Sequence, residues 1–148
     1  TPARPLAAAA LADTTGAAAR SDLFKGKWSL IFVGDGACDQ PCRNALWTIR
    51  QTRLLLAEDM NRVQRIFIAE GRCCDRAFLE REHPGLETVT LVQPLNGEWL
   101  RQFPREGERH FVFIVDPLGN LMMRFDTAQN PKGLLEDLNR LLKLSHIG

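Results

Sequence analysis

Five short segments of the 148-residue chain carry the hydrophobic pattern of β-strands. Residues 28–33 and 63–69 are almost continuously apolar, as strands covered on both faces of a sheet require. Two later apolar runs are separated by the turn sequence Asp-Pro-Leu-Gly-Asn, which predicts a β-hairpin. The predicted strands are residues 27–33, 63–69, 88–92, 111–115 and 121–125.

The segments between these strands have a helical period. A first helix is expected to begin near Pro41, since proline is tolerated in the first turn, and to run to about Asp59. A short helix is expected over 75–82, and a last helix opens at Asn130-Pro131 with its leucines on one face. The resulting order β-α-β-α-β-β-α predicts an α/β, thioredoxin-like fold. In that fold a central mixed sheet has flanking helices, and a C-terminal hairpin and helix close the chain.

The amino-acid composition mainly argues against certain classes of function. Basic and acidic residues nearly cancel, at 19 and 18, and no Lys/Arg stripe forms, so a nucleic-acid role has little support. No apolar run in the sequence is long enough to cross a bilayer. Residues 1–20 are rich in Ala, Thr, Pro and Gly, and we expect a flexible spacer there and one domain over 21–148. Because the chain begins with Thr1, any signal peptide or membrane anchor is expected upstream.

The four cysteines form two close pairs, Cys38/Cys42 and Cys73/Cys74. Close pairs favour redox or metal chemistry over a stapling disulfide framework. The first pair follows the turn residues Gly34-Asp35-Gly36 at the end of a strand and stands at the start of a helix, whose N-terminus favours the thiolate form. Cys38 and Cys42 are therefore the predicted catalytic dithiol, and their thiolates would select soft metals such as Cu(I) or Zn(II).

The stretch from Gly26 to Cys42 resembles the Sco/SenC family of copper chaperones for cytochrome oxidase assembly. In that family a strand of the type GKxxLxxFGYTxC leads into a Cys-x-x-x-Cys pair. Here Gly26-Lys27-Trp28-Ser29-Leu30 leads through Phe32 and Gly34 to Cys38-Asp39-Gln40-Pro41-Cys42. The family's usual proline after the first cysteine is Asp39 here, and a proline precedes the second cysteine instead. The resemblance implies a divergent member with a thioredoxin-like fold and a copper ion, Cu(I) or Cu(II), held by the cysteines.

His110 is the predicted third metal ligand, beside Cys38 and Cys42. It directly precedes the first hairpin strand, a position that packs against the dithiol in thioredoxin folds. A gapless alignment instead places the ligand histidine of the Sco family at Glu108, and a two-residue shift keeps the same side of an extended strand. Either the ligand has moved to His110, or this protein lacks the family's histidine ligand.

The second cysteine pair has several interpretations. One interpretation is that Cys73 and Cys74 form a second redox site or supply an accessory metal ligand. The others are that they act as a resolving partner for the first pair, or that one is simply a buried cysteine and the other an incidental neighbour. The next residue, Asp75, approximately matches an acidic position of the family or caps the short helix. His83 is expected to be exposed in a turn, and His146 is assigned no role.

Three functions remain open. The first is a Sco-like copper-binding protein of the periplasm, held at the inner membrane only through an upstream anchor. Its partner would be a cytochrome oxidase subunit or another copper or thiol assembly protein. The second is a thiol-disulfide oxidoreductase, in which Cys38, expected to be the more exposed thiol, attacks and Cys42 resolves. The third is a non-catalytic thioredoxin-like module that docks an assembly partner.

Overall fold

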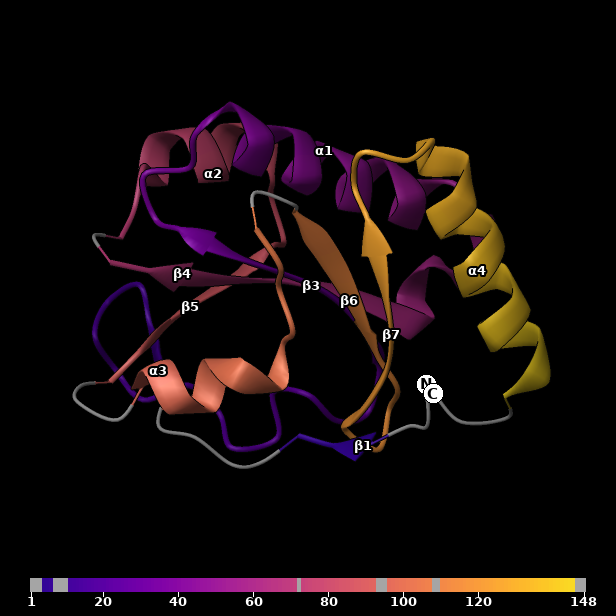
Figure 1. Cartoon of the computed structure of the whole chain (residues 1–148), viewed down its shortest axis with the longest axis horizontal. Helices are drawn as coiled ribbons and strands as arrows, with labels where there is room; N and C mark the ends of the chain where they lie inside the picture. Colours follow the sequence, from indigo (N-terminus) through magenta and orange to yellow (C-terminus); the bar gives the residue numbers. More distant parts are fainter. Residues whose placement is uncertain (1–3, 7–10, 72, 93–95, 108–109, 146–148) are drawn as a thin grey trace.

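A mixed sheet forms the centre of the molecule (Figure 1). The computed structural model describes residues 4–6, 11–71, 73–92, 96–107 and 110–145. Within this part of the chain the sheet has seven strands in the order β1-β7-β6-β3-β4-β5-β2. The strands are β1 (Arg4–Pro5), β2 (Leu11–Asp13), β3 (Trp28–Asp35), β4 (Val63–Glu70), β5 (Glu87–Leu91), β6 (Phe111–Val115) and β7 (Asn120–Asp126).

The central strands agree with the hydrophobic pattern. β3 pairs in parallel with β4 and antiparallel with β6, so β3 lies between two neighbours. Its first six residues are buried, as its continuous apolar run predicts. β4 pairs in parallel with β5, and β6 and β7 form the predicted antiparallel hairpin. The predicted thioredoxin-like fold is confirmed.

The helices are α1 (Gln40–Leu54), α2 (Arg76–Glu82), α3 (Asn96–Trp99) and α4 (Pro131–Leu144), with 3₁₀ turns at η1 (Ala57–Arg62) and η2 (Leu100–Gln102). The prediction that the first helix continues to Asp59 is wrong. Helix α1 ends at Leu54, and Ala57 then adopts a left-handed φ of 53° that no α-helix can contain. Leu56, in the turn after the helix, is buried in the core. Among the described helices, none has both the length and the apolar character needed to span a membrane.

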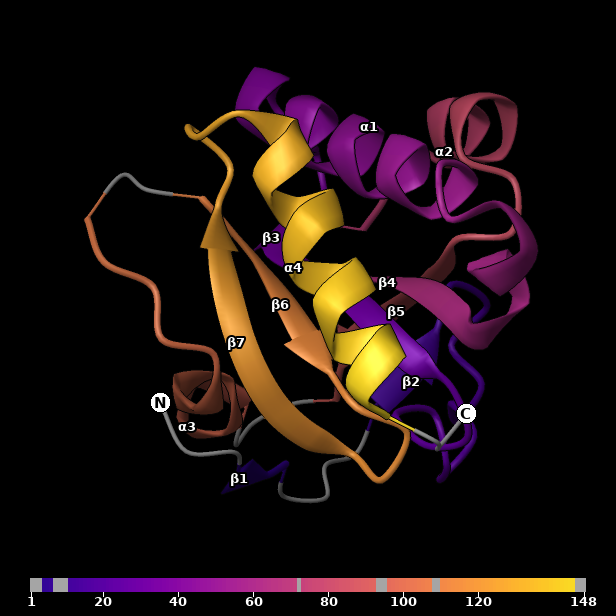
Figure 2. The ribbon, with the colours of Figure 1, turned by 90° about the vertical axis from the view of Figure 1, so that its right-hand side faces the viewer.

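Helices α1, α2 and α4 cover one face of the sheet, and α3 lies on the other (Figures 1 and 2). The alternation of β3 explains the two cores, because Leu30 and Phe32 join the cluster under α1 and α4 whereas Ile31 and Val33 join the opposite one. The crossovers through α1 and α2 progress in the same direction across the sheet. Because both crossover connections have the same handedness, they place both helices on the same face of the sheet.

The described parts of the N-terminal segment differ from the spacer expected over 1–20. Arg4–Pro5 pairs with β7 and Leu11–Asp13 pairs with β5, so each adds a strand to one edge of the sheet. Leu11 is buried in the core opposite α1. The physical reason is that an edge strand offers unpaired N–H and C=O groups, and this segment supplies partners for them.

Candidate functional site

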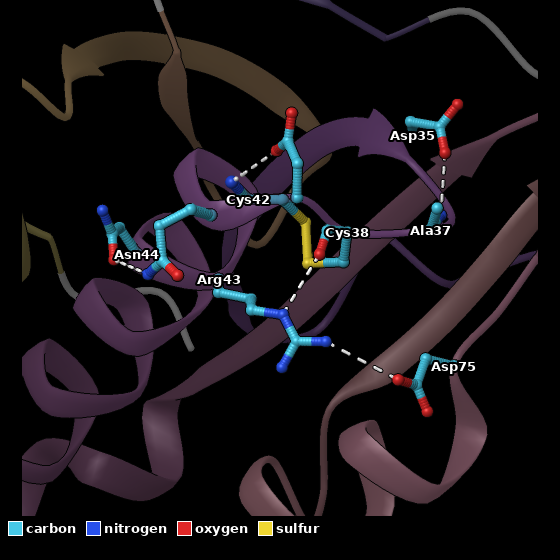
Figure 3. The surroundings of a disulfide bond; sticks show 9 residues. Asp35, Ala37, Cys38, Cys42, Arg43, Asn44 and Asp75 are labelled. Atoms are coloured by element: carbon cyan, nitrogen blue, oxygen red, sulfur yellow. Dashed lines mark hydrogen bonds and ion pairs between the residues drawn. A yellow bond between two sulfur atoms is a disulfide. The ribbon is translucent and has the colours of Figure 1, made fainter.

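The predicted dithiol lies at the carboxyl end of β3, where Cys38 and Cys42 are joined by a disulfide (Figure 3). Asp35 holds the turn before them. Its carboxylate accepts a hydrogen bond from the Ala37 N–H at 2.8 Å, and its carbonyl accepts one from the Cys38 N–H at 3.0 Å. Cys38 has a φ of 50°, a left-handed conformation that is uncommon outside glycine. This turn brings Cys38 back towards the start of α1, within bonding distance of Cys42.

The first turn of α1 positions the second cysteine. Asp39 is the N-cap residue, and its carboxylate accepts a hydrogen bond from the Cys42 N–H at 3.1 Å. The positive end of the helix dipole would stabilise a thiolate formed here by reduction, while the negative charge of Asp39 acts against it. The local sequence thus supplies both the helix start and the charge that tunes it.

Both cysteines are buried in the disulfide form. Cys38 is 2% exposed and Cys42 is 3% exposed, and both belong to the core cluster under α1. The expectation that Cys38 is the more exposed of the two is therefore wrong for this state. The left-handed turn at Cys38 places its side chain in the core, so an external thiol needs some opening of the surroundings to reach the sulfur atoms.

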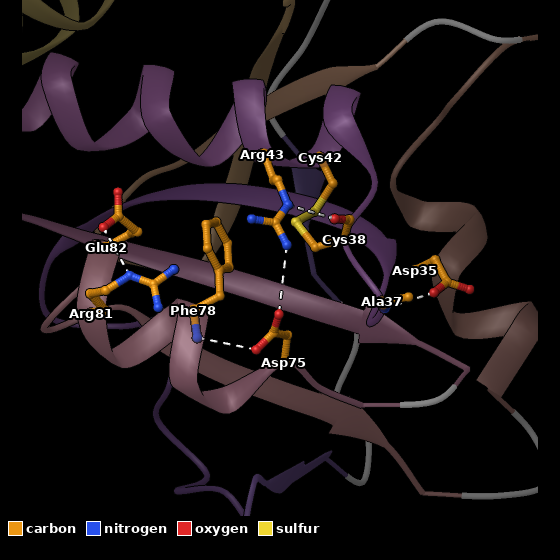
Figure 4. Close-up of polar contacts among 9 residues, drawn as sticks. All are labelled: Asp35, Ala37, Cys38, Cys42, Arg43, Asp75, Phe78, Arg81 and Glu82. Atoms are coloured by element: carbon orange, nitrogen blue, oxygen red, sulfur yellow. Dashed lines mark hydrogen bonds and ion pairs between the residues drawn. A yellow bond between two sulfur atoms is a disulfide. The ribbon is translucent and has the colours of Figure 1, made fainter.

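Arg43 connects the dithiol turn to the next loop of the sheet edge (Figures 3 and 4). Its Nε donates a hydrogen bond to the Cys38 carbonyl at 3.2 Å, and its guanidinium lies 3.6 Å from the Asp75 carboxylate. The same guanidinium stacks over the Phe78 ring, 3.9 Å from the centroid. The sequence alone does not indicate this role of Arg43. Its place beside Cys42 was the available signal, but its partners come from α2 and the loop before it.

The second cysteine pair lies in that next loop. Cys73 and Cys74 are joined to each other by a disulfide and are half-buried, packed against the same cluster as the first pair. They are therefore bonded to one another here rather than to Cys38 or Cys42. Asp75 caps α2, since its carboxylate accepts a hydrogen bond from the Phe78 N–H at 3.1 Å.

His110 lies on the face of the sheet that carries the dithiol. Its ring centroid is 6.4 Å from that of Phe32, and Phe32 belongs to the cluster that contains both cysteines. Its carbonyl accepts hydrogen bonds from the Thr127 N–H at 2.9 Å and hydroxyl at 2.8 Å, which fix the chain at the start of β6. Among the described residues, no three His, Cys, Asp or Glu side chains form a group that could hold a metal. Cys38 and Cys42 are joined in the disulfide here, so they are not free thiolates in this state. Glu108 and His146 lie outside the described residues.

His83 corrects another expectation, because it is 4% exposed rather than a solvated turn residue. Its ring packs edge-on against Phe78 at 5.4 Å between centroids, and its buried Nδ1 has no hydrogen-bond partner among the described residues. Burial, aided by the nearby Arg50 and Arg65 cations, lowers the pKa of His83 to about 4. The imidazole is thus neutral at physiological pH, and it contributes to packing rather than to the dithiol site.

A thioredoxin-like protein with a Cys-x-x-x-Cys pair is the class that this fold and site define. The family model described as "Transmembrane-like, thioredoxin-like, C-terminal domain" matches residues 28–145. The chain therefore belongs to this thioredoxin-like family. No curated protein matches the chain in sequence.

Solved structures share the fold at low sequence identity. Yeast Sco1 with copper bound has a TM-score of 0.79 and 17% identity, covering 97% of this chain and 94% of its own. Bradyrhizobium japonicum ScoI with copper bound has a TM-score of 0.70 and 21% identity, covering 93% and 99%. The thioredoxin domain of a thiol-disulfide oxidoreductase from Bacteroides vulgatus has a TM-score of 0.67 and 16% identity, covering 93% and 97%. The resemblance to Sco proteins seen in the sequence is thus confirmed at the level of the fold.

Proposed function

We propose that this protein is a Sco-like copper-binding and thiol-redox protein that assists copper delivery to cytochrome c oxidase. The observation that carries the proposal is the Cys38–Cys42 disulfide at the start of α1, at the carboxyl end of a central strand. Similar structures with copper bound, from yeast and Bradyrhizobium japonicum, support copper as the cargo.

The donor set fits copper once the disulfide is reduced. Reduction of Cys38–Cys42 by two electrons gives two thiols, and soft thiolates select Cu(I). His110 would act as a third ligand, since it lies on the same face of the sheet and contacts the same core cluster through Phe32. Oxidation back to the disulfide removes the thiolate donors, so the redox state of the pair would control metal release.

The proposed function also implies a partner and a location. Copper delivery to cytochrome oxidase implies an oxidase subunit or another copper or thiol assembly protein as the partner. A disulfide that cycles between states suits an oxidising compartment. We therefore propose that the protein works in the periplasm, close to the inner membrane.

An anaerobic Cu(I) titration against a competing chelator tests the copper proposal. We expect fully reduced protein to retain one copper ion, and Cys38→Ser/Cys42→Ser to lose it. Cys73→Ser/Cys74→Ser is the matched control and should retain it, because it removes the same number of thiols from the neighbouring loop. His110→Ala should bind more weakly if the imidazole is a ligand. Failure of the reduced wild-type protein to retain copper would refute the proposal.

A second candidate is a thiol-disulfide oxidoreductase that keeps a partner's cysteines reduced. It is favoured by the Cys38–Cys42 disulfide, because a dithiol at this position can exchange without any third ligand. The neighbour from Bacteroides vulgatus, a thiol-disulfide oxidoreductase domain, supports it. The test is reduction of a disulfide substrate, and a Cys38→Ser protein with full activity would contradict this candidate.

A further inference from the structure

We propose that Cys73–Cys74 is a second redox centre, which accepts reducing equivalents at the surface and passes them to the buried Cys38–Cys42 pair. The inference rests on the redox part of the proposed function. It identifies the cysteine pair at which reducing equivalents enter the protein. It follows from three features of the structure: the register of two loops, the links between them, and the difference in exposure between the two cysteine pairs.

The two pairs occupy equivalent positions at one edge of the sheet. β3 and β4 are parallel, and their last residues, Asp35 and Glu70, are register partners. Cys38 is the third residue after Asp35, and Cys73 is the third residue after Glu70. Neighbouring parallel strands end side by side, so the loops that carry the two pairs leave the sheet together.

Two contacts tie these loops to one another. At their beginning, the Gly36 N–H donates a hydrogen bond to the Glu70 carbonyl at 2.8 Å. At their end, Arg43, next to Cys42, lies 3.6 Å from the carboxylate of Asp75, next to Cys74 (Figure 4). Each loop is therefore joined to the other before and after its cysteines. The Arg43 guanidinium also places a positive charge at the turn that carries Cys38, where it favours a thiolate.

The pairs differ in access to solvent. Cys38 and Cys42 are 2% and 3% exposed, whereas Cys73 and Cys74 are half-buried and pack against the same cluster from outside. Thiol-disulfide exchange requires direct attack on a sulfur atom, so an external reductant reaches Cys73–Cys74 more easily. The outer pair is thus placed as the entry point for the inner one.

An external dithiol is the only other reactant that this exchange of electrons and protons requires. That dithiol is oxidised to a disulfide and reduces Cys73–Cys74 to two thiols. One thiolate of this pair then attacks the Cys38–Cys42 disulfide, forms a mixed disulfide and releases one thiolate of the inner pair. Attack by the second thiol re-forms Cys73–Cys74 and releases the other inner cysteine. Two electrons and two protons pass from the outer to the inner pair.

Trapping of the mixed disulfide is the direct test. Cys42→Ser and Cys38→Ser each leave one inner thiol, which should attack the oxidised outer pair within the same molecule. Peptide mapping of the monomer without reductant should find Cys38 or Cys42 joined to the 73–74 peptide in one of these variants. The same variants combined with Cys73→Ser/Cys74→Ser must lack this species. Absence of any cross-linked peptide would overturn the inference.

The order of reduction gives a second test on the wild-type protein. With less than one equivalent of dithiothreitol, rapid acid quench and alkylation should show the first free thiols at Cys73 and Cys74, and later thiols at Cys38 and Cys42. At about 0.1 mM dithiothreitol, Cys73→Ser/Cys74→Ser should slow reduction of the inner pair severalfold, because dithiothreitol must then reach the buried sulfur atoms of Cys38 and Cys42 directly. Inner thiols that appear first, or an unchanged rate, would overturn the inference.

These results separate the two proposals. If Cys73→Ser/Cys74→Ser is reduced at the wild-type rate and still retains copper, only the second redox centre is refuted. If Cys38–Cys42 resists reduction in both proteins, the proposed function fails together with the inference. Circular dichroism of each variant verifies that its fold is intact.

Discussion

The buried imidazole of His83 makes the stability of this fold depend on pH in a direction that the structure determines. Burial and the neighbouring Arg50 and Arg65 cations oppose its protonation, while Glu82 favours it to a smaller extent. The pKa of His83 is about 4 in the folded protein, against 6.5 for an unperturbed histidine. The unfolded chain therefore binds a proton at a higher pH than the folded chain does.

The sign and size of the effect follow from this difference. Well above pH 6.5 the imidazole is neutral in both states, and its contribution to stability is fully present. As the pH falls from 6.5 towards 4, the unfolded state gains a proton that the folded state does not, so stability is lost. The full difference corresponds to about 3 kcal/mol, and roughly 2 kcal/mol of it should be lost between pH 8 and pH 5.

Urea unfolding with the disulfides intact measures this effect at a series of pH values. His83→Phe keeps an aromatic ring next to Phe78 and removes the titrating group, so its stability should fall less steeply with pH than that of the wild type. Arg50→Gln removes one of the repelling cations and should make the His83 contribution to the slope smaller. A difference between wild type and His83→Phe that stays constant from pH 8 to pH 5 would refute the reasoning.

Two further predictions concern the charges around the dithiol. Asp39→Asn keeps an oxygen for the Cys42 N–H but removes a negative charge, so alkylation of the reduced cysteines at mildly acidic pH should become roughly two- to fivefold faster. An unchanged rate in a time course followed by mass spectrometry would contradict this. Arg43→Gln removes the ion pair with Asp75 and the stacking on Phe78, and should lower the free energy of unfolding by about 1 kcal/mol. Arg43→Lys is its control, since it keeps the charge, and equal stability of the wild-type and Gln proteins would refute a linking role for Arg43.

Local sequence patterns correctly predicted the helices and strands that are specified by residues close to one another in the sequence. The apolar runs of β3, β4 and β6 identify buried strands, since strands with both faces covered need apolar residues at almost every position. Asn130 and Pro131 mark the start of α4 correctly, because the cap and the first turn depend on adjacent residues alone. The same holds for the dithiol, whose cysteines are set by one turn and one helix start.

Predictions failed where distant segments decide the outcome. Leu11–Asp13 has no strand pattern of its own, and it becomes a strand because the edge of β5 offers it hydrogen bonds. His83 looks like a turn residue, yet packing against Phe78 buries it. The helix after the dithiol ends early because the chain must turn at Ala57 before it enters β4.

The sequence by itself determined the thioredoxin-like order of elements and the position of Cys38 and Cys42 at a helix start, because hydrophobic period, turn residues and capping act over a few neighbouring residues. Only the tertiary structure decided that Cys73–Cys74 leaves the sheet beside Cys38–Cys42 and that Arg43 joins the two loops through Asp75. These relations depend on the register of parallel strands that are far apart along the chain. Pairing and packing of the whole sheet fix that register, and no local pattern contains it.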